Sequence, residues 1–335
     1  MSNSFKPIIL ITGATATGKT KCSLDLAKII SEKGIECEII NADSLLFYRE
    51  LNIGTAKPSH EELSQVPHHL INNRSIKNPM NASEFYNEAN KTIQALFSKN
   101  KIPIITGGSA FYVRALIKGL YNSNSPSLDA IEEIDKIEES EGYEKIRELL
   151  LKHDPESFER LHYNDKYRNK RALEHFFSTG IKFSELRDEK EKEAPYDFSR
   201  PKIETWRIHN IYLDIPKEEH WDIILKRIDK MFENGLVNEV KELSKNKHNI
   251  NCKPLQSIGY KETLHYLGHH QANNVEITNL QELRERIFIN TRRLAKSQRT
   301  FFKKCFPKKV YHPLKNQDKI IIECLEFLHQ YSNFK

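Results

Sequence analysis

The sequence is poor in the features that mark membrane, fibrous or secreted proteins. Its apolar runs are short, and none among the 335 residues approaches the roughly 20 residues that a transmembrane helix needs. Glycine and proline number only 12 and 13, which excludes a collagen-like or low-complexity chain. The segment from Met1 to Pro7 lacks a charged region followed by an apolar one, so no secretory signal is expected.

Cysteine is also scarce, and its spacing excludes a common kind of metal site. The five cysteines lie at positions 22, 37, 252, 305 and 324, and no two have C-x-x-C spacing. That spacing is typical of zinc and redox sites, so neither kind of site is expected. An odd number of separated thiols indicates reduced, structural cysteines, and we expect a cytoplasmic protein without a membrane partner.

The net charge of +6 is unevenly distributed along the chain. Residues 284–309 contain ten basic groups and one acid, so this window carries +9 and the rest of the chain −3. A mildly acidic body with one concentrated basic segment indicates a polyanionic partner. A solvated helix face explains the same pattern without a partner, and charge alone does not separate the two.

Strand-like and helix-like patterns alternate in the N-terminal third. Buried strands are predicted at residues 7–12, 36–41 and 102–106, and helices at 20–33 and 81–100. A further strand is predicted over 207–215, and the last third is mostly helical, with helices over 217–233, 236–245, 260–267, 278–302 and 318–330. Such alternation predicts parallel strands joined by crossover helices, which is an α/β fold.

The strongest local signal lies between the first predicted strand and the first predicted helix. It fits the pattern G-x-x-x-x-G-K-[ST] and consists of Gly13, Ala14, Thr15, Ala16, Thr17, Gly18, Lys19 and Thr20. The backbone N–H groups of such a loop and the N-terminus of the following helix bind phosphate oxygens. Lys19 adds a positive charge, and the Thr20 hydroxyl is suited to hold Mg²⁺.

These patterns predict a P-loop NTPase-like parallel sheet flanked by helices, with a helical insertion domain. Residues 1–121 form the first part of the P-loop core. Residues 122–204 are charged and helical with few strand signals, and form the insertion. Residues 205–335 return to the core and end in helices that carry the basic segment.

A carboxylate follows the second predicted strand. Asp43 lies in the run Asn41-Ala-Asp43-Ser44, and ligands of open α/β sheets bind beyond the carboxyl ends of the strands. We therefore expect Asp43 to face the same crevice as the phosphate loop, as a metal ligand or a general base. An Asx turn or a helix cap is the structural alternative for this residue.

Further motifs follow in order along the chain. They include D-S-L-L-F-Y-R from Asp43, I-G-T-A-K-P from Ile53, P-H-H-L from Pro67, G-G-S-A-F-Y from Gly107, and, downstream, N-D-K-Y-R-N-K-R-A-L-E at 164–174, G-L-V-N-E-V at 235–240, S-I-G-Y-K-E at 257–262 and T-R-R-L-A-K-S-Q at 291–298. With the phosphate loop, this series resembles the tRNA dimethylallyltransferase (tRNA isopentenyltransferase) family from residue 13 to about residue 302.

The sequence departs from the family pattern at several points. Leu46 stands where many members carry Gln, and Ser109 replaces the usual Thr but keeps a hydroxyl. No C-x-x-C and H-x-H pattern follows the basic segment, so we expect no zinc-finger extension of the kind that eukaryotic relatives carry. The resemblance is therefore to the bacterial type of enzyme.

The resemblance implies a reaction and its chemical groups. A dimethylallyl group would move from dimethylallyl diphosphate to the exocyclic amine of the adenosine 3′-adjacent to the anticodon in tRNA. The phosphate loop would then hold diphosphate, with Lys19, Arg227 and Mg²⁺ on Thr20 stabilising the leaving group. Asp43 would accept the proton of the amine.

The target adenosine is stacked in the anticodon loop, so it has to be flipped out to reach the diphosphate. The insertion domain and the basic segment would hold the single-stranded loop. The residues that the resemblance and the charge pattern assign to tRNA are Asp43, Ser44, Leu45, Leu46, Ser109, Tyr167, Arg168, Lys170, Arg171, Gln256, Gly259, Tyr260, Lys261, Arg292, Lys296 and Arg299. By their spacing, the last three are predicted to form one basic stripe on a helix.

Three other readings explain part of the pattern. A small-molecule P-loop kinase accounts for the loop and Asp43, but not for the basic segment. An adenylate isopentenyltransferase shares the core motifs, but has no need of that segment. A non-catalytic RNA-binding protein with a relic loop does not account for the intact Gly18-Lys19-Thr20 and Asp43.

For the oligomeric state of the protein, we expect a monomer.

Overall fold

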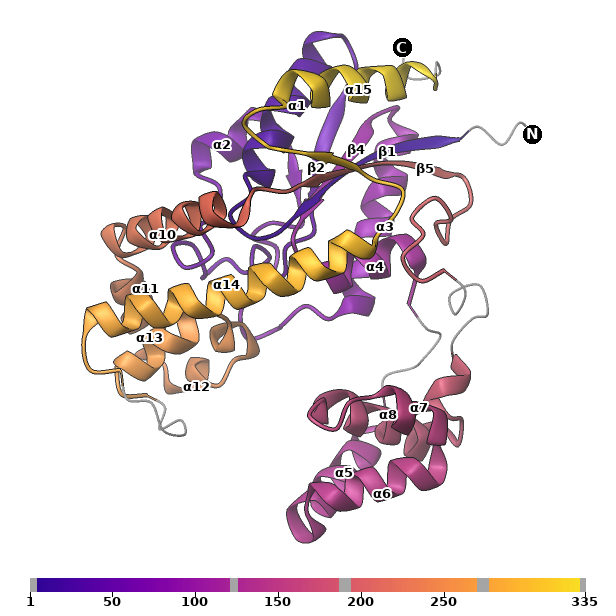
Figure 1. The fold of residues 1–335 in the computed structure, drawn as a ribbon, viewed down its shortest axis with the longest axis vertical. Coiled ribbons are helices and arrows are strands. Elements are labelled where there is room, and N and C mark those ends of the chain that lie inside the picture. The colour runs from indigo at the N-terminus through magenta and orange to yellow at the C-terminus, as the bar shows by residue number, and fades with distance from the viewer. Residues whose placement is uncertain (1–4, 121–125, 187–193, 270–276, 332–335) are drawn as a thin grey trace. The chain divides into compact units, whose positions relative to one another are not determined.

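The computed structural model describes residues 5–120, 126–186, 194–269 and 277–331 (Figure 1). The chain divides into two compact units, the first made of Met1–Gly119 with Tyr196–Lys335 and the second of Leu120–Pro195. The second boundary lies before the predicted start of the returning core at residue 205. The reason is a pair of backbone hydrogen bonds, from Phe198 N to Phe306 O and from Phe306 N to Tyr196 O, which hold this stretch in the first unit.

A parallel sheet forms the centre of the first unit, and the predicted α/β fold is confirmed. The strand order is β3-β2-β4-β1-β5-β6, and every neighbouring pair is parallel. The strands are β1 (Lys6–Gly13), β2 (Cys37–Asn41), β3 (His68–His69), β4 (Ile102–Gly107), β5 (Trp206–Leu213) and β6 (Lys309–Tyr311). Because β1 is flanked on both sides, the phosphate loop at its end lies in the middle of the sheet edge where ligands bind.

The two faces of the sheet are covered by different helices. Successive strand residues point to opposite faces, so Ile8 and Leu10 of β1 belong to one core and Ile9 and Ile11 to the other. Helices α1 (Lys19–Glu32) and α15 (Gln317–His329) cover the second of these faces. The first is covered by α3 (Ala82–Ser98), α4 (Ala110–Lys118), α10 (Lys217–Glu233) and α14 (Leu280–Lys304).

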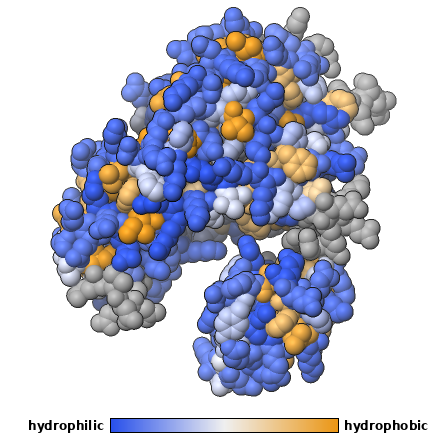
Figure 2. All heavy atoms as spheres, viewed as in Figure 1, coloured by the Kyte–Doolittle hydropathy of each residue, from blue (hydrophilic) through white to orange (hydrophobic). Residues whose placement is uncertain are grey.

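Shorter helices complete the first unit. They are α2 (His60–Gln65), α11 (Leu236–Ser244), α12 (Lys247–Ile250) and α13 (Tyr260–Tyr266). On the face seen in Figure 2, hydrophobic side chains are scattered among hydrophilic ones. Within the described residues, no helix combines the length and apolar character needed to cross a membrane.

The second unit is a helical bundle with a core of its own. It contains α5 (Leu128–Glu141), α6 (Tyr143–His153), α7 (Pro155–Arg160) and α8 (Lys166–Thr179). Ile134, Ile146, Leu150 and Leu173 are fully buried together in it. These four helices lie within the predicted helical insertion of residues 122–204, and the contact of this unit with tRNA stays a prediction.

Candidate active site

The phosphate loop connects β1 to α1 and leaves the first turn of α1 open. Gly18 has φ 77°, a left-handed conformation that favours glycine. Among the residues that the structure describes, no side chain caps α1, and no acid lies in its first turn, so its N-terminal N–H groups can bind an anion. Inside the loop, Thr17 Oγ1 donates to Ala14 O at 2.9 Å and Lys19 Nζ donates to the same oxygen at 2.7 Å.

Asp43 follows β2, at the same edge of the sheet, and its backbone is fixed by Asn41. The Asn41 amide accepts a hydrogen bond from Asp43 N at 2.8 Å and donates one to Asp43 O at 3.0 Å. The Asp43 Oδ1 atom accepts from Leu45 N at 3.1 Å. In the part of the chain that the structure describes, no hydrogen bond reaches Oδ2, so this atom is open to a ligand.

Two cations lie within electrostatic reach of this carboxylate. Burial lowers the pKa of Lys19 to about 8; Asp43 opposes that shift and Arg227 adds to it. Burial also lowers the pKa of Arg227, and Asp43 again opposes the shift. Arg227 comes from α10 and donates to Thr55 O at 2.9 Å. The structure thus brings Lys19, Asp43 and Arg227 together beside the phosphate loop.

The turn after β4 packs directly against the Asp43 segment. A Cβ atom on Gly107 would lie 2.3 Å from the carbonyl carbon and oxygen of Ala42, so only glycine fits there. The Ser109 hydroxyl accepts a hydrogen bond from Ser44 N at 2.8 Å. Ser109 therefore keeps a structural contact that needs a hydroxyl, and this contact places it beside Ser44.

A second loop is held in place by one carboxylate. Glu239 of α11 accepts hydrogen bonds from three consecutive backbone N–H groups, at Asn52, Ile53 and Gly54. It also accepts from the Tyr260 hydroxyl at 2.7 Å. Glu239 thereby fixes the loop whose Thr55 carbonyl accepts the hydrogen bond of Arg227.

The structure corrects the predicted role of Tyr260. Its side chain is fully buried beneath Gly54, and Gly259 before it is buried as well. A side chain without exposed surface supports the neighbouring loop and does not contact RNA. Gln256 and Lys261 are exposed, and Leu45 and Leu46 are partly buried beside Asp43.

The predicted basic stripe on α14 is also corrected. Arg299 faces inward, donating to Asp214 Oδ1 at 2.9 Å and to Ile215 O at 3.0 Å. The Arg292 guanidinium lies 3.5 Å from the centre of the Trp221 ring on α10. Lys296 alone of the three is exposed, whereas the Arg292 side chain turns towards α10 and the Arg299 side chain towards the end of β5.

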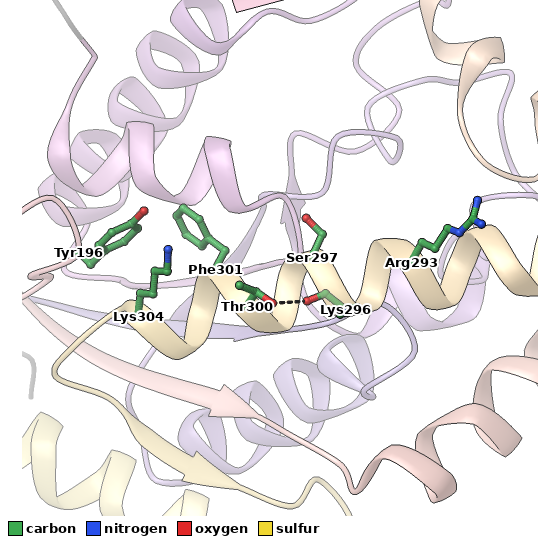
Figure 3. A pocket seen from close by; sticks show the side chains of 7 residues that line it. All are labelled: Tyr196, Arg293, Lys296, Ser297, Thr300, Phe301 and Lys304. Atoms are coloured by element: carbon green, nitrogen blue, oxygen red, sulfur yellow. Dashed lines mark hydrogen bonds between the residues drawn. The ribbon is translucent and has the colours of Figure 1, made fainter. Parts of the chain in front are cut away.

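A different face of α14 carries exposed basic groups. A pocket of about 360 Å³ is lined by Tyr196, Arg293, Lys296, Ser297, Thr300, Phe301 and Lys304, and we call these residues the α14 groove (Figure 3). The rings of Tyr196 and Phe301 meet edge to face at 5.5 Å, and Lys304 Nζ lies 5.5 Å from the Tyr196 ring centre. Cations beside aromatic rings are suited to single-stranded nucleic acid.

The predicted tRNA residues of the second unit lie on α8. Tyr167 is 73% exposed, and the exposed Arg168 pairs with Asp165 at 3.0 Å. Lys170 pairs with Asp135 and Glu138 of α5, and Arg171 pairs with Glu174. Tyr167 and Arg168 are therefore the most accessible of the four, whereas Lys170 is engaged inside its own unit.

Glu239, Gln298 and His220 form hydrogen bonds with loops of the site, and the sequence prediction gives these residues no role. Glu239 and Gln298 lie in motifs that carry the resemblance, but nothing in those motifs indicates what either side chain contacts. His220 lies in α10, and Figure 1 shows that helix beside the sheet edge. No local pattern marks His220, because its partner is a loop more than two hundred residues away.

Mg²⁺ fits the groups that are present. Among the described residues no three His, Cys, Asp or Glu side chains cluster as a metal site. Mg²⁺ commonly uses one or two protein oxygens together with substrate phosphates and water, so it needs no such cluster. Thr20 is the second residue of α1, and its hydroxyl makes no hydrogen bond within the described chain; Asp43 Oδ2 likewise accepts none there.

Comparisons with known proteins agree on one family. A sequence profile described as IPP transferase matches residues 46–305. The tRNA dimethylallyltransferase 1 of Trichlorobacter lovleyi is 39% identical over 88% of this chain and 90% of its own length. The tRNA dimethylallyltransferase of Bacillus cereus is 36% identical over 88% and 86%, respectively.

Solved structures give the same result for the fold. The full-length tRNA isopentenylpyrophosphate transferase of Bacillus halodurans has a TM-score of 0.67 at 28% identity, covering 98% of both chains. A eukaryotic dimethylallyltransferase, described as acting on tRNA, has a TM-score of 0.77 at 26% identity, covering 97% of this chain and 80% of its own. These likenesses extend over both units.

Proposed function

The chain belongs to the IPP transferase family, and from this we infer that it is a tRNA dimethylallyltransferase. It transfers a dimethylallyl group from dimethylallyl diphosphate to the exocyclic amine of the adenosine 3′-adjacent to the anticodon, and releases diphosphate. The observation that best supports this chemistry is the Asp43 carboxylate beside two cations at the mouth of a phosphate loop.

The leaving group is held by positive charge. As the bond between carbon and the diphosphate oxygen breaks, negative charge grows on the diphosphate. The N-terminal amides of α1, the Lys19 ammonium and the Arg227 guanidinium face that charge. Mg²⁺, held through Thr20 and the substrate, would neutralise part of it. Lys19 is free to turn from Ala14 O to the diphosphate, because a lysine ammonium is a mobile donor.

Asp43 acts on the attacking amine, whereas the cations act on the leaving diphosphate. The adenosine amine attacks the carbon of the allyl group, forming a C–N bond, and then carries one proton too many. Asp43 Oδ2 accepts that proton, while Oδ1 stays bound to Leu45 N and keeps the carboxylate in position. The base and the leaving-group cations lie within electrostatic reach of one another, as a displacement at a single carbon requires.

We propose that the α14 groove of the first unit binds the anticodon loop, and, as a separate proposal, that Tyr167 and Arg168 of the second unit contact tRNA. Arg293, Lys296 and Lys304 are exposed, and Tyr196 and Phe301 offer partly exposed rings between them. This assignment replaces Arg292 and Arg299, whose side chains are engaged with Trp221 and Asp214.

Changing Arg293, Lys296 and Lys304 together to Gln should raise the KM for tRNA and flatten its salt dependence. Each phosphate contact on a single strand contributes a slope of about 0.7, so three contacts contribute about 2. The KM for dimethylallyl diphosphate should stay nearly unchanged. The control is a triple Gln variant of the exposed Lys28, Lys33 and Lys319, on the opposite face of the sheet. Equal salt slopes in the two variants would exclude the groove.

The low pKa of Lys19 predicts a pH dependence. The cationic form binds diphosphate, and the pKa of about 8 means that this form is lost as pH rises through 8. The kcat/KM for dimethylallyl diphosphate should therefore be flat below about pH 8 and fall above it. Arginine stays protonated throughout this range, so Lys19→Arg should remove the high-pH limb. A limb that persists in Lys19→Arg would assign it to another group.

Transfer assays separate this function from its alternatives. The protein is incubated with labelled dimethylallyl diphosphate and either unmodified tRNA or AMP, and separately with γ-labelled ATP and small acceptors. We expect label in tRNA only. Label in AMP would indicate an adenylate isopentenyltransferase, and phosphoryl transfer would indicate a kinase.

We place the reaction in the cytoplasm, where tRNA precursors and reduced thiols coexist. The monomeric state stays a prediction.

A further inference from the structure

Both backbone polar groups of Thr15, a residue of the phosphate loop, are held by side chains from distant helices. Thr15 N donates to Gln298 Oε1 at 2.8 Å, and Gln298 belongs to α14. The Thr15 carbonyl oxygen lies 2.8 Å from Nε2 of His220, which belongs to α10. The loop is therefore fixed from outside at its centre, as well as by its own internal hydrogen bonds.

The other end of Gln298 reaches the turn after β4. Its Nε2 donates to Gly108 O at 2.8 Å, and the side chain is 9% exposed. A Cβ atom on Gly108 would lie 2.9 Å from this nitrogen and 3.3 Å from Lys19 Nζ, so the three groups are closely packed. Because the next residue, Ser109, binds Ser44 N, one amide links the diphosphate side of the site to the segment that carries Asp43.

The contacts of His220 determine its tautomer. Arg299 donates to His220 Nδ1 at 3.0 Å, which requires that nitrogen to be unprotonated. The proton then lies on Nε2, which donates to Thr15 O. Burial lowers the pKa of His220 and favours this neutral form; the contact with Thr15 and the charge of Asp214 oppose the shift, and Arg299 and Lys19 add to it. Asp214 in turn fixes Arg299.

We propose that Gln298 and His220 are positioning residues that hold the N–H and the carbonyl group of Thr15 and set the phosphate loop at a fixed distance from Asp43. This proposal rests on the proposed function. Displacing a reacting group by about 1 Å can cost roughly 10²-fold in rate, and such displacement leaves the binding groups themselves intact. The expected signature is therefore a loss in kcat with little change in KM for tRNA.

The test measures kcat, both KM values and the Tm of Gln298→Met, which has similar volume and lacks both hydrogen bonds. We expect kcat to fall roughly 10- to 100-fold, with KM for tRNA within about threefold. The control is Arg284→Met, which breaks the ion pair between α14 and Asp229 of α10 far from the loop. Equal losses in the two variants, or a kcat within about twofold of the original, would overturn the role of Gln298.

Variants of His220 provide an independent test of the proposal, which remains available if Gln298→Met does not fold. His220→Leu removes the donor to Thr15 O, whereas His220→Gln supplies an N–H group at similar reach. We expect His220→Leu to lose roughly 10-fold or more in kcat and His220→Gln to recover most of it. Equal activity in the two would overturn the proposal. If the unaltered protein transfers no label to tRNA, the proposed function itself fails, which is a separate result.

Discussion

Replacing Asp43 with asparagine should lower kcat for dimethylallyl transfer by roughly 10²–10⁴-fold, which is the usual effect of losing a general base. Asparagine has the same shape and still accepts the Leu45 N–H through its carbonyl oxygen, so the segment after β2 keeps its geometry. The open oxygen becomes an NH₂ group that cannot accept a proton. Binding of tRNA should remain within a few-fold of its original strength.

Single-turnover rates at saturating substrates measure this effect directly, and tRNA binding is measured separately. Asp25→Asn on α1 is the control, since the Asp25 carboxylate accepts a hydrogen bond from Gln317 of α15. Near-normal turnover of Asp43→Asn would exclude Asp43 as the base. A loss that appears only in tRNA affinity would make Asp43 a binding residue.

Replacing Lys19 with methionine should lower kcat/KM for dimethylallyl diphosphate by roughly 10²–10³-fold, the scale of one preorganised charge at a leaving group. Methionine keeps much of the aliphatic stem and removes the charge. The KM for tRNA should change little, because Lys19 lies beneath the phosphate loop and contacts Ala14 O.

The control for Lys19 is Lys28→Met on the exposed face of the same helix. Initial rates at varied dimethylallyl diphosphate concentration, with tRNA saturating, give the result. An unchanged response to that concentration in Lys19→Met would show that the loop does not hold the leaving group.

The sequence predicts most of the fold because its patterns are local. The run of apolar residues in β1, the loop after it and the helical periodicity of α10 each depend on neighbours in the chain, and the predicted range 217–233 agrees with α10 as observed. The strands β3 and β6 have only two and three residues, too few for any periodicity to show. Their places follow from pairing with β2 and β5, which is a tertiary effect.

The residues of the candidate site also fall into those that local motifs predict and those that depend on tertiary packing. The phosphate loop and Asp43 are marked by local motifs, and the structure brings them together with Arg227. Spacing alone places Arg292, Lys296 and Arg299 on one face of α14, but it does not reveal that Asp214 and Trp221 lie opposite that face. The exposed basic face is shifted around the helix, to the α14 groove.

Buried support contacts are the least predictable part of the site. Tyr260 lies in a motif of the family, yet its hydroxyl donates a hydrogen bond to Glu239 inside the protein. Gln298 and His220 meet at Thr15 from positions that are distant in sequence. Such contacts depend on how α10 and α14 pack against the sheet, and neither composition nor periodicity records that packing.

The most direct test is to locate the product in tRNA. Unmodified tRNA is incubated with the protein, Mg²⁺ and dimethylallyl diphosphate, then digested, and the modified nucleoside is identified and mapped by mass spectrometry. We predict a dimethylallyl group on the exocyclic amine of the adenosine 3′-adjacent to the anticodon, and none after the same time with Asp43→Asn. A dimethylallyl group on another nucleotide, or on AMP while tRNA stays unmodified, would contradict the assigned function.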